Sequence, residues 1–297
     1  MNATHTIIGL PDAGKTTYLA ALWHLVTSGE VESSLILDRL DGDVNYLNDM
    51  VESWQRCEKV RRTTSAEDHP IIIHLKTRTS SNQITLNFTD LSGEKFEQQF
   101  ASRFCSPEYV SEINGEGGLL LFINADRPHK GVTIQDTKGL FEEEATFDQE
   151  EATVSEPMTE DIEWDPKFVS EQAQLVDLLQ CLQGPPFVQR RRRLAVIISA
   201  WDVVTNRDTA EEWLRHEMPF LWQFLSTNKA TFDTKMWGVS AQGGAIENDA
   251  EGKVIDTEVR RGLLRQTPSN RVRCVTSGSD SPDITPPLLW LSGLADE

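Results

Sequence analysis

The chain of 297 residues is 38% hydrophobic and 8% aromatic, a balance that excludes an intrinsically disordered protein and suits one large domain or two small ones. Its 28 Lys and Arg against 47 Asp and Glu give a formal net charge of −19, which argues against nucleic-acid binding over a broad face because phosphate backbones are also negative. No apolar run reaches the roughly 18 residues of a membrane span, no signal peptide precedes the first strand, and the four cysteines lie far apart, so we expect a cytoplasmic protein with reduced thiols.

The first predicted elements are a short strand at residues 5–8, a glycine-rich loop at 9–16 and a helix. The loop reads Gly-Leu-Pro-Asp-Ala-Gly-Lys-Thr and matches G-x-x-x-x-G-K-[ST], the phosphate-binding loop. Apolar residues between 19 and 26 then recur at i, i+3, i+4 and i+7, which places them on one helix face. Strand, loop and helix in this order are the context that the motif requires, so an ordinary glycine-rich turn is the weaker interpretation.

This loop predicts a bound nucleoside triphosphate. Successive backbone N–H groups and the positive end of the helix dipole would surround the β-phosphate. Lys15 would bridge β- and γ-phosphate oxygens, and Thr16 would offer its hydroxyl to Mg²⁺. The predicted phosphate-binding residues are Gly9, Asp12, Ala13, Gly14, Lys15, Thr16 and Thr17.

Apolar residues between 40 and 54 recur at helical spacing and predict an amphipathic helix over residues 38–60. Packing against the rest of the domain is favoured over binding to a partner helix. Thr63 and Thr64 come shortly afterwards, and a threonine at this point of the chain is able to contact both Mg²⁺ and the γ-phosphate. An ordinary loop threonine is an equally weighted alternative.

Residues 71–75 and 84–89 alternate in hydropathy across a polar turn, which predicts a β-hairpin. The hairpin would deliver Asp90, the first residue of a D-x-x-G motif, to the phosphates. Two other D-x-x-G matches, at residues 136 and 249, do not end a strand-like run. We expect Asp90 to hold Mg²⁺ through water, and Gly93 to donate its N–H to the γ-phosphate and lose that contact on hydrolysis.

Further along the chain, apolar runs at 119–125 and 194–200 suit buried parallel strands, and residues 168–182 have helical periodicity. Between them, residues 139–166 contain eleven acids and no Lys or Arg. We interpret this stretch as a solvated, partly disordered insertion, with a docking tail for a basic partner as the alternative.

With these motifs in this order, the chain resembles P-loop GTPases of the translation-factor and Ras-like class, and its Pro-bearing loop is most similar to that of Era-like GTPases. The resemblance implies an α/β fold, a Ras-like G domain with a mostly parallel sheet, one antiparallel strand and helices on both faces. It covers residues 1–297 as a single domain with insertions at about 38–69, 127–167 and 246–285.

In that family, the strand corresponding to 194–200 ends in Asn-Lys-x-Asp, which reads guanine. This chain has Ser199-Ala200-Trp201-Asp202 instead, so the resemblance implies that Asp202 accepts hydrogen bonds from guanine, while the Asn and Lys are lost. A plain turn cap is the alternative for Asp202. Trp201 would either give the base an apolar surface or be buried. Ser240-Ala241 corresponds to the family's Ser-Ala-Lys strand end, where the Ala241 N–H would bond the guanine 6-oxo group.

Glu94 stands where many family members have Gln or His to orient the attacking water. A carboxylate can accept the same hydrogen bond, but it also brings negative charge towards the γ-phosphate, so we predict slow hydrolysis assisted by a partner. Arg103 and Arg127 are candidates for an internal arginine finger, although surface arginines are the favoured interpretation. The predicted catalytic residues are therefore Lys15, Thr64 and Glu94, and the predicted Mg²⁺ ligands are Thr16, Thr64 and Asp90.

The leading hypothesis is a GTP-binding, Mg²⁺-dependent GTPase that acts as a switch between GTP and GDP forms and meets a protein effector or activator. One alternative is a nucleotide-binding assembly subunit with negligible hydrolysis, and a P-loop ATPase is a weaker one. The Asp-x-x-Gly-Glu box and the segment from Asp283 to Leu291 also resemble bacterial GTPases associated with conflict and defence gene clusters.

Overall fold

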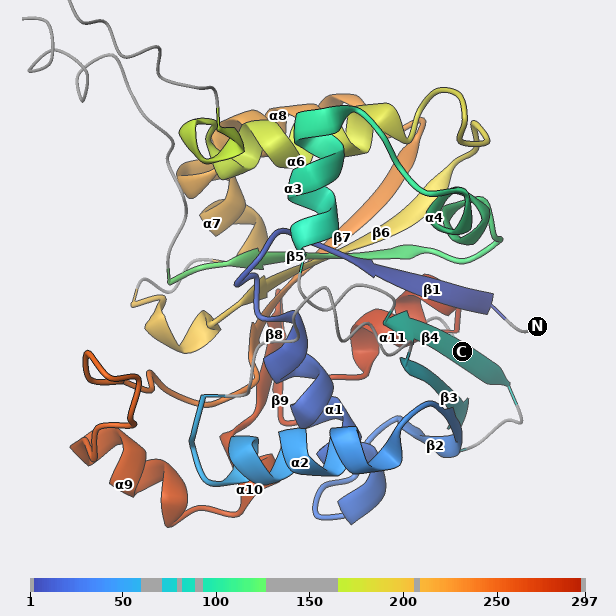
Figure 1. The fold of residues 1–297 in the computed structure, drawn as a ribbon. Coiled ribbons are helices and arrows are strands. Elements are labelled where there is room, and N and C mark those ends of the chain that lie inside the picture. Colours follow the sequence, from blue (N-terminus) through green and yellow to red (C-terminus); the bar gives the residue numbers. More distant parts are fainter. Residues whose placement is uncertain are drawn as a thin grey trace, which may run out of the picture.

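The structure is a computed structural model and describes residues 3–59, 71–78, 82–88, 93–126, 165–205 and 209–294. Within these residues the strands are β1 (Ala3–Ile8), β2 (Leu35–Asp41), β3 (Ile71–Thr77), β4 (Gln83–Phe88), β5 (Leu119–Asn124), β6 (Arg192–Ser199), β7 (Phe232–Ser240), β8 (Arg273–Thr276) and β9 (Ser279–Ser281). They form one sheet in the order β2-β3-β4-β1-β5-β6-β7-β8-β9 (Figure 1). The early strand β1 therefore lies inside the sheet, between β4 and β5.

The middle of the sheet is parallel. β1 pairs in parallel with β4 on one side and β5 on the other, and β6 pairs in parallel with β5 and β7. At one end β2, β3 and β4 pair antiparallel, and at the other end β7, β8 and β9 do so. The prediction of a mostly parallel α/β sheet is confirmed. The expected antiparallel strand is β3, and the structure adds a second one, β8, which the sequence did not predict.

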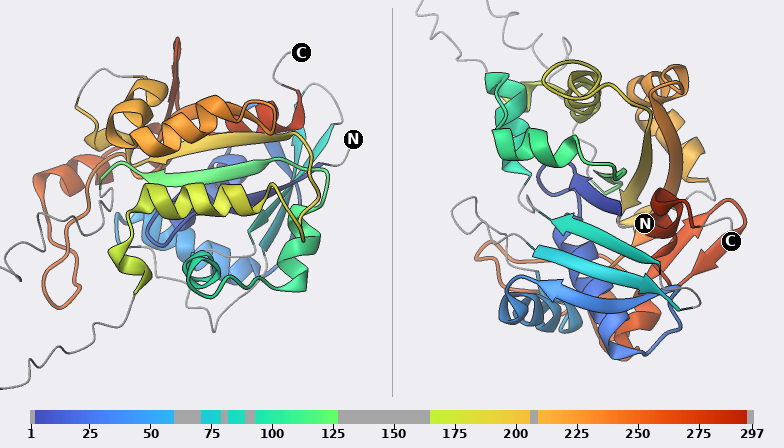
Figure 2. Two further views of the ribbon diagram at one scale, coloured as in Figure 1. Left: turned by 90° about the horizontal axis from the view of Figure 1, so that it is seen from above. Right: turned by 90° about the vertical axis from the view of Figure 1, so that its right-hand side faces the viewer.

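Helices cover both faces of the sheet (Figure 2). α1, α2 and α11 pack on one face, while α3, α4, α6, α7 and α8 pack on the other. The described helices are α1 (Lys15–Ser28), α2 (Val44–Gln55), α3 (Glu94–Ser102), α4 (Pro107–Ile113), α6 (Glu171–Cys181), α7 (Ala210–Glu217), α8 (Pro219–Thr227), α9 (Glu258–Leu264), α10 (Pro268–Arg271) and α11 (Pro286–Ser292), with short 3-10 helices at Pro166–Phe168 and Trp201–Val203. None of these helices has the length and apolar character needed to cross a membrane.

Strand β5 explains why its sequence is a continuous apolar run. Leu120 and Phe122 point into the core under α1, whereas Leu119, Leu121 and Ile123 point into the core under α6 and α8. Because both faces are covered, both sets of side chains are buried, as is usual in a parallel sheet. This buried centre fixes the carboxyl ends of the parallel strands, where the candidate site lies.

The predicted helix over residues 38–60 is wrong at its start. Leu40 belongs to β2, which pairs antiparallel with β3, and the helix α2 begins only at Val44. Asp43 caps this helix, because its carboxylate accepts hydrogen bonds from the backbone N–H groups of Asn45 and Tyr46. Residues 246–285 contain α9, α10, β8 and β9, and most of the acidic stretch at 139–166 lies outside the described residues.

Candidate functional site

The loops that follow β1, β5, β6 and β7 meet at one edge of the sheet, since the carboxyl ends of parallel strands share an edge. They surround a cavity of about 390 Å³. Its lining includes the phosphate loop from Pro11 to Thr17, the end of β5 at Asn124, Asp202 beyond β6, and Ala241 beyond β7. Glu94 also lines it, together with Glu58 and Lys59 beyond α2. Predicted phosphate-side and base-side residues therefore line a single cavity.

The phosphate loop is held in a compact turn around the Lys15 side chain. Lys15 is only 2% exposed, and its Nζ donates hydrogen bonds to the carbonyl oxygens of Gly9, at 2.6 Å, and Leu10, at 2.9 Å. Gly14 precedes α1 with φ +89°, and a Cβ there would lie 2.6 Å from the Ser199 hydroxyl oxygen, so glycine is required. The loop thus presents the N-terminus of α1 to the cavity, as phosphate binding needs.

Two side chains at strand ends tie this loop to the sheet. The Ser199 hydroxyl at the end of β6 donates to the Ala13 carbonyl at 2.8 Å, and the Asn124 amide at the end of β5 donates to the Asp12 carbonyl at 2.8 Å. Sequence reasoning treated Ser199 as the loss of a supporting Asn and did not single out Asn124. The available signal was a polar residue directly after each buried apolar run.

Replacing Ser199 by Ala should loosen the phosphate loop. The change leaves the Ala13 carbonyl without its hydroxyl donor, which costs about 1–2 kcal/mol, so nucleotide should dissociate roughly 5–30 times faster. Release of a fluorescent guanine nucleotide measures this, with Ser226→Ala on the distant α8 as the matched control. Equal release rates in Ser199→Ala and wild type would contradict the role.

Gly93 lies directly against the phosphate loop at the start of α3. Its φ is +78°, and a Cβ at this position would lie 2.6 Å from the Lys15 Nζ and from main-chain atoms of Leu10 and Pro11. Glu94 follows in the first turn of α3. Gly93 therefore packs against the Lys15 ammonium, the group expected to bind the γ-phosphate. Asp90, Thr63 and Thr64, all predicted near that phosphate, lie outside the described residues.

At the base-side end, Asp202 is oriented by Ser240. The Ser240 hydroxyl donates to Asp202 Oδ1 and accepts from the backbone N–H of Gly243 at 3.1 Å. Ser240 is 3% exposed and does not line the cavity, unlike Asp202 and Ala241. The structure thus brings the two predicted base-side motifs together and gives Ser240 a contact to Asp202 rather than to the cavity.

Trp201 does not cover the cavity. A Cβ on Gly238 would lie 2.2 Å from the Trp201 ring, so the indole packs flat on the main chain of β7 and joins the core beneath α7 and α8. The Trp201 side chain is half-buried against this core, which favours the packing interpretation over a surface for the base. Val203, Ala245 and Ile246 instead contribute apolar side chains to the cavity that Asp202 lines.

The end of α2 is tied to the base-side loop. Trp54 is fully buried and donates its indole N–H to the Ala241 carbonyl at 2.8 Å. Two guanidinium groups bond carbonyls at and just beyond the end of this helix: Arg271 Nη2 donates to Gln55 O at 3.2 Å, and Arg260 Nε donates to Cys57 O at 3.2 Å. Sequence reasoning placed α2 against the domain but did not predict these contacts.

Arg103, a candidate arginine finger, forms an ion pair with Asp177 of α6 and does not line the cavity. Arg127 lies outside the described residues. Across the described part of the chain, no group of three or more His, Cys, Asp or Glu could hold a metal ion. Mg²⁺ beside a nucleotide needs no such group, because phosphates and water supply most of its oxygen ligands. The Thr16 hydroxyl in the cavity lining fits that donor set.

Residues 6–291 match the sequence profile of the family described as Double-GTPase 1, and no curated protein matches the chain. The chain is similar to the Arl6 BBS3 small GTPase from Trypanosoma brucei with bound nucleotide analogue GppNp, at 10% identity and TM-score 0.37 over 91% of this chain and 99% of that one. It is also similar to the S. cerevisiae Ski7 GTPase-like domain bound to GTP, at 12% identity and TM-score 0.37 over 86% of this chain and 46% of that one.

Proposed function

This chain belongs to the Double-GTPase 1 family, and from that membership we propose that it is a Mg²⁺-dependent GTPase that switches between GTP and GDP forms. One observation carries the proposal. A single cavity is lined by Lys15 and Thr16 from the phosphate loop, Glu94 from α3, and Asp202 and Ala241 from the strand ends. These groups match, in order, the phosphates, the attacking water and a guanine base.

On the phosphate side, Lys15 would exchange its two loop carbonyls for β- and γ-phosphate oxygens. We assign Mg²⁺ to the Thr16 hydroxyl, with Asp90 acting through water and Thr64 as the further ligand. The ion would neutralise negative charge on the phosphates. The N–H groups from Asp12 to Thr17 would complete the anion site at the start of α1.

On the base side, Asp202 would accept hydrogen bonds from the guanine N1–H and 2-amino groups, and Ala241 would donate its N–H to the 6-oxo group. Adenine offers neither of those donors at these positions. The contact with Ser240 supports this role, because it restricts the rotation of the Asp202 carboxylate. Val203 and Ile246 are the apolar side chains beside it.

Switching would start at Gly93. This residue touches the phosphate loop beside Lys15, so a γ-phosphate arriving there must change the contact. Since α3 begins at Glu94, any shift of Gly93 is passed directly to that helix. An effector that distinguishes GTP from GDP forms would then read α3 and its surroundings.

Intrinsic hydrolysis should be slow. We expect a single-turnover rate constant below about 10⁻² s⁻¹ for GTP, because the Glu94 carboxylate can orient water but adds negative charge beside the γ-phosphate. Glu94→Ala should lower this rate at least about tenfold while nucleotide binding persists. Phosphate release under single-turnover conditions measures both.

A wild-type rate near the 1–100 s⁻¹ typical of kinases would overturn the slow switch. Equal rates in wild type and Glu94→Ala would remove the catalytic role of Glu94. If wild type binds GTP but releases no phosphate, the assembly-subunit alternative replaces the switch. The presence of Glu94 in the cavity lining, where many family members have Gln or His, is the observation that favours the assembly subunit.

A further inference from the structure

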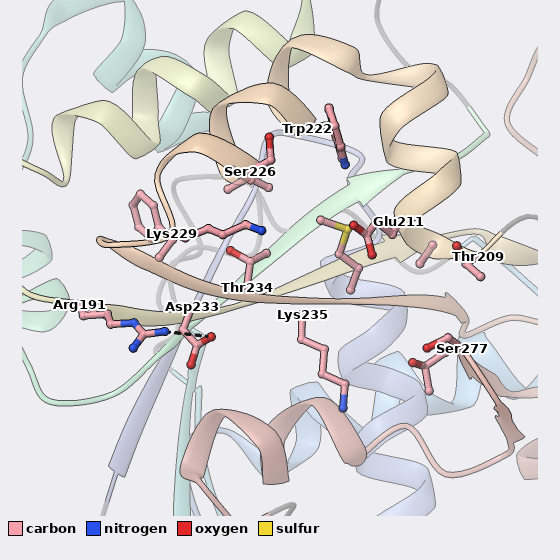
Figure 3. A pocket seen from close by; sticks show the side chains of 15 residues that line it. Arg191, Thr209, Glu211, Trp222, Ser226, Lys229, Asp233, Thr234, Lys235 and Ser277 are labelled. Carbon is pink, nitrogen blue, oxygen red and sulfur yellow. Dashed lines mark ion pairs between the residues drawn. The ribbon is translucent and has the colours of Figure 1, made fainter.

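The edge of β7 is only half paired. β8 pairs with Gly238, Val239 and Ser240, so among the described residues no strand lies beside the earlier part of β7 on that side. A cavity of about 420 Å³ runs along this open part. Side chains of β7, α7 and α8 line it, as do Thr276 and Ser277 where β8 ends (Figure 3). This feature is separate from the cavity of about 390 Å³ that is lined by Lys15, Asp202 and Ala241 beyond the carboxyl end of β7, which we call the nucleotide cavity.

The main-chain groups on the open edge belong to alternate residues. Arg192 of β6 donates its N–H to the Thr231 carbonyl at 2.8 Å, so residues 233 and 235 also face β6. Thr234 and Met236 therefore direct their N–H and C=O groups outward. The Thr234 hydroxyl is buried and has no hydrogen-bond partner among the described residues. Such an edge is a template for another strand.

We propose that a second copy of this chain pairs with the β7 edge, antiparallel and two-fold symmetric about Thr234. The sequence of the edge, Phe232-Asp233-Thr234-Lys235-Met236, is self-complementary in this register. Asp233 of each copy lies opposite Lys235 of the other, which gives two symmetry-related pairs of opposite charge. The two Thr234 residues exchange main-chain hydrogen bonds, and their hydroxyls become neighbours.

The cavity walls repeat this complementarity. In Figure 3 the Lys229 side chain extends from the amino-terminal end of β7 to a position above Thr234, whereas Glu211 lies further towards the carboxyl end of the strand. The two-fold axis therefore carries Glu211 of one copy towards Lys229 of the other. At physiological ionic strength, charges further apart than about 8 Å are screened, so these local pairs outweigh the repulsion between two copies of net charge −19.

In a two-fold interface both copies use the same surface patch, so that patch must be complementary to itself. Binding to a different protein would not require this self-complementarity. Asp233 and Lys235 share the sheet face opposite α7 and α8, because Phe232 and Met236 pack on the core beneath those helices. On this face the Lys235 ammonium lies 5.4 Å from the Trp237 ring centroid, and Asp233 Oδ1 forms an ion pair with Arg191 Nη2 at 3.5 Å. The Asp233 side chain is still 43% exposed in this ion pair, so its carboxylate is accessible to Lys235 of the other copy.

The test is a charge-exchange series read by sedimentation equilibrium over a dilution series. Wild type should show a concentration-dependent dimer. Lys235→Asp and Asp233→Lys should each weaken dimerisation about tenfold or more, since two attractive contacts become repulsive. The double variant Asp233→Lys/Lys235→Asp should restore dimerisation, because a lysine at position 233 of each copy then lies opposite an aspartate at position 235 of the other.

A second arm tests the backbone. Thr234→Pro removes an N–H that faces outward, so the pairing with β6 is retained, but dimerisation should be lost. Thr234→Val keeps that N–H and removes only the hydroxyl, so it should weaken the dimer by a few fold at most. Nucleotide binding should be unchanged in all variants, because their positions lie away from the nucleotide cavity.

A monomeric wild type at every concentration would overturn the proposal. A dimer that survives Lys235→Asp and Thr234→Pro would overturn it too, because its interface would lie elsewhere. The same holds if the double charge exchange dimerises no better than the single changes. Failure of wild type to bind GTP would instead count against the proposed function and leave this interface unaffected.

Discussion

Lys15→Ala should abolish detectable GTP binding. Lys15 is nearly fully buried beneath the nucleotide cavity, and its ammonium already has the loop carbonyls of Gly9 and Leu10 as hydrogen-bond acceptors. Loss of two charge-assisted hydrogen bonds to phosphate oxygens costs about 3–6 kcal/mol, which corresponds to roughly 10²- to 10⁴-fold in affinity. Titration with a fluorescent GTP analogue measures the loss.

A suitable control is Lys76→Ala, since Lys76 forms an exposed ion pair with Asp38 at the far side of the sheet. This change removes the same charge from the protein and should leave nucleotide affinity within about twofold. Thermal unfolding of Lys15→Ala should accompany the titration, because the variant leaves two loop carbonyls without their donor. A folded Lys15→Ala protein that binds GTP like wild type would rule out the phosphate loop as the triphosphate site.

Asp202→Asn should shift base preference from guanine to xanthine. The amide N–H₂ of Asn would face the 2-amino group of guanine, donor against donor, whereas xanthine presents a 2-oxo acceptor there. Affinity for GTP should fall by about 10²-fold or more, since a site built around hydrogen bonds rejects a ligand that leaves them unmade. Competition between GTP and XTP for the cavity measures the exchange.

Ser240→Ala is the informative companion to Asp202→Asn. It removes the hydroxyl that orients Asp202 but keeps the carboxylate, so guanine affinity should fall while guanine remains preferred over xanthine. If Asp202→Asn retains the wild-type preference for GTP, Asp202 does not read the base. Its remaining role would then be to accept the hydrogen bond from Ser240, which links the short helix at Trp201–Val203 to the end of β7.

Local patterns predicted much of the fold. The glycine loop, the hairpin of β3 and β4, and the apolar strands β5 and β6 all lie where residue spacing placed them. Each depends on contacts between near neighbours in sequence or on burial from both faces, and such signals survive in a single chain. Membership of the Double-GTPase 1 family confirms the P-loop GTPase assignment that followed from them. The similarity to defence-associated GTPases stays a prediction.

The errors arise where distant segments decide the outcome. Leu40 fits a helical spacing, but pairing with β3 places it in a strand, and the helix capped by Asp43 begins only at Val44. Trp201 packs against the core because Gly238, on the next strand, leaves room for its ring. The hydrogen bonds from Asn124 and Ser199 to the phosphate loop form only once β5 pairs with β1 and β6 pairs with β5. None of these neighbours is visible in local periodicity.

The fixed end of α2 preorganises the two residues that follow it. Trp54 donates to the Ala241 carbonyl, and Arg260 donates to the Cys57 carbonyl, so this end is held beside the cavity. Glu58, whose N–H donates to the Ser53 carbonyl at 2.9 Å, and Lys59 line the cavity directly beyond it. A ligand that enters the cavity therefore meets a carboxylate and an ammonium on main chain that is already ordered, so its binding costs little conformational entropy at these two residues.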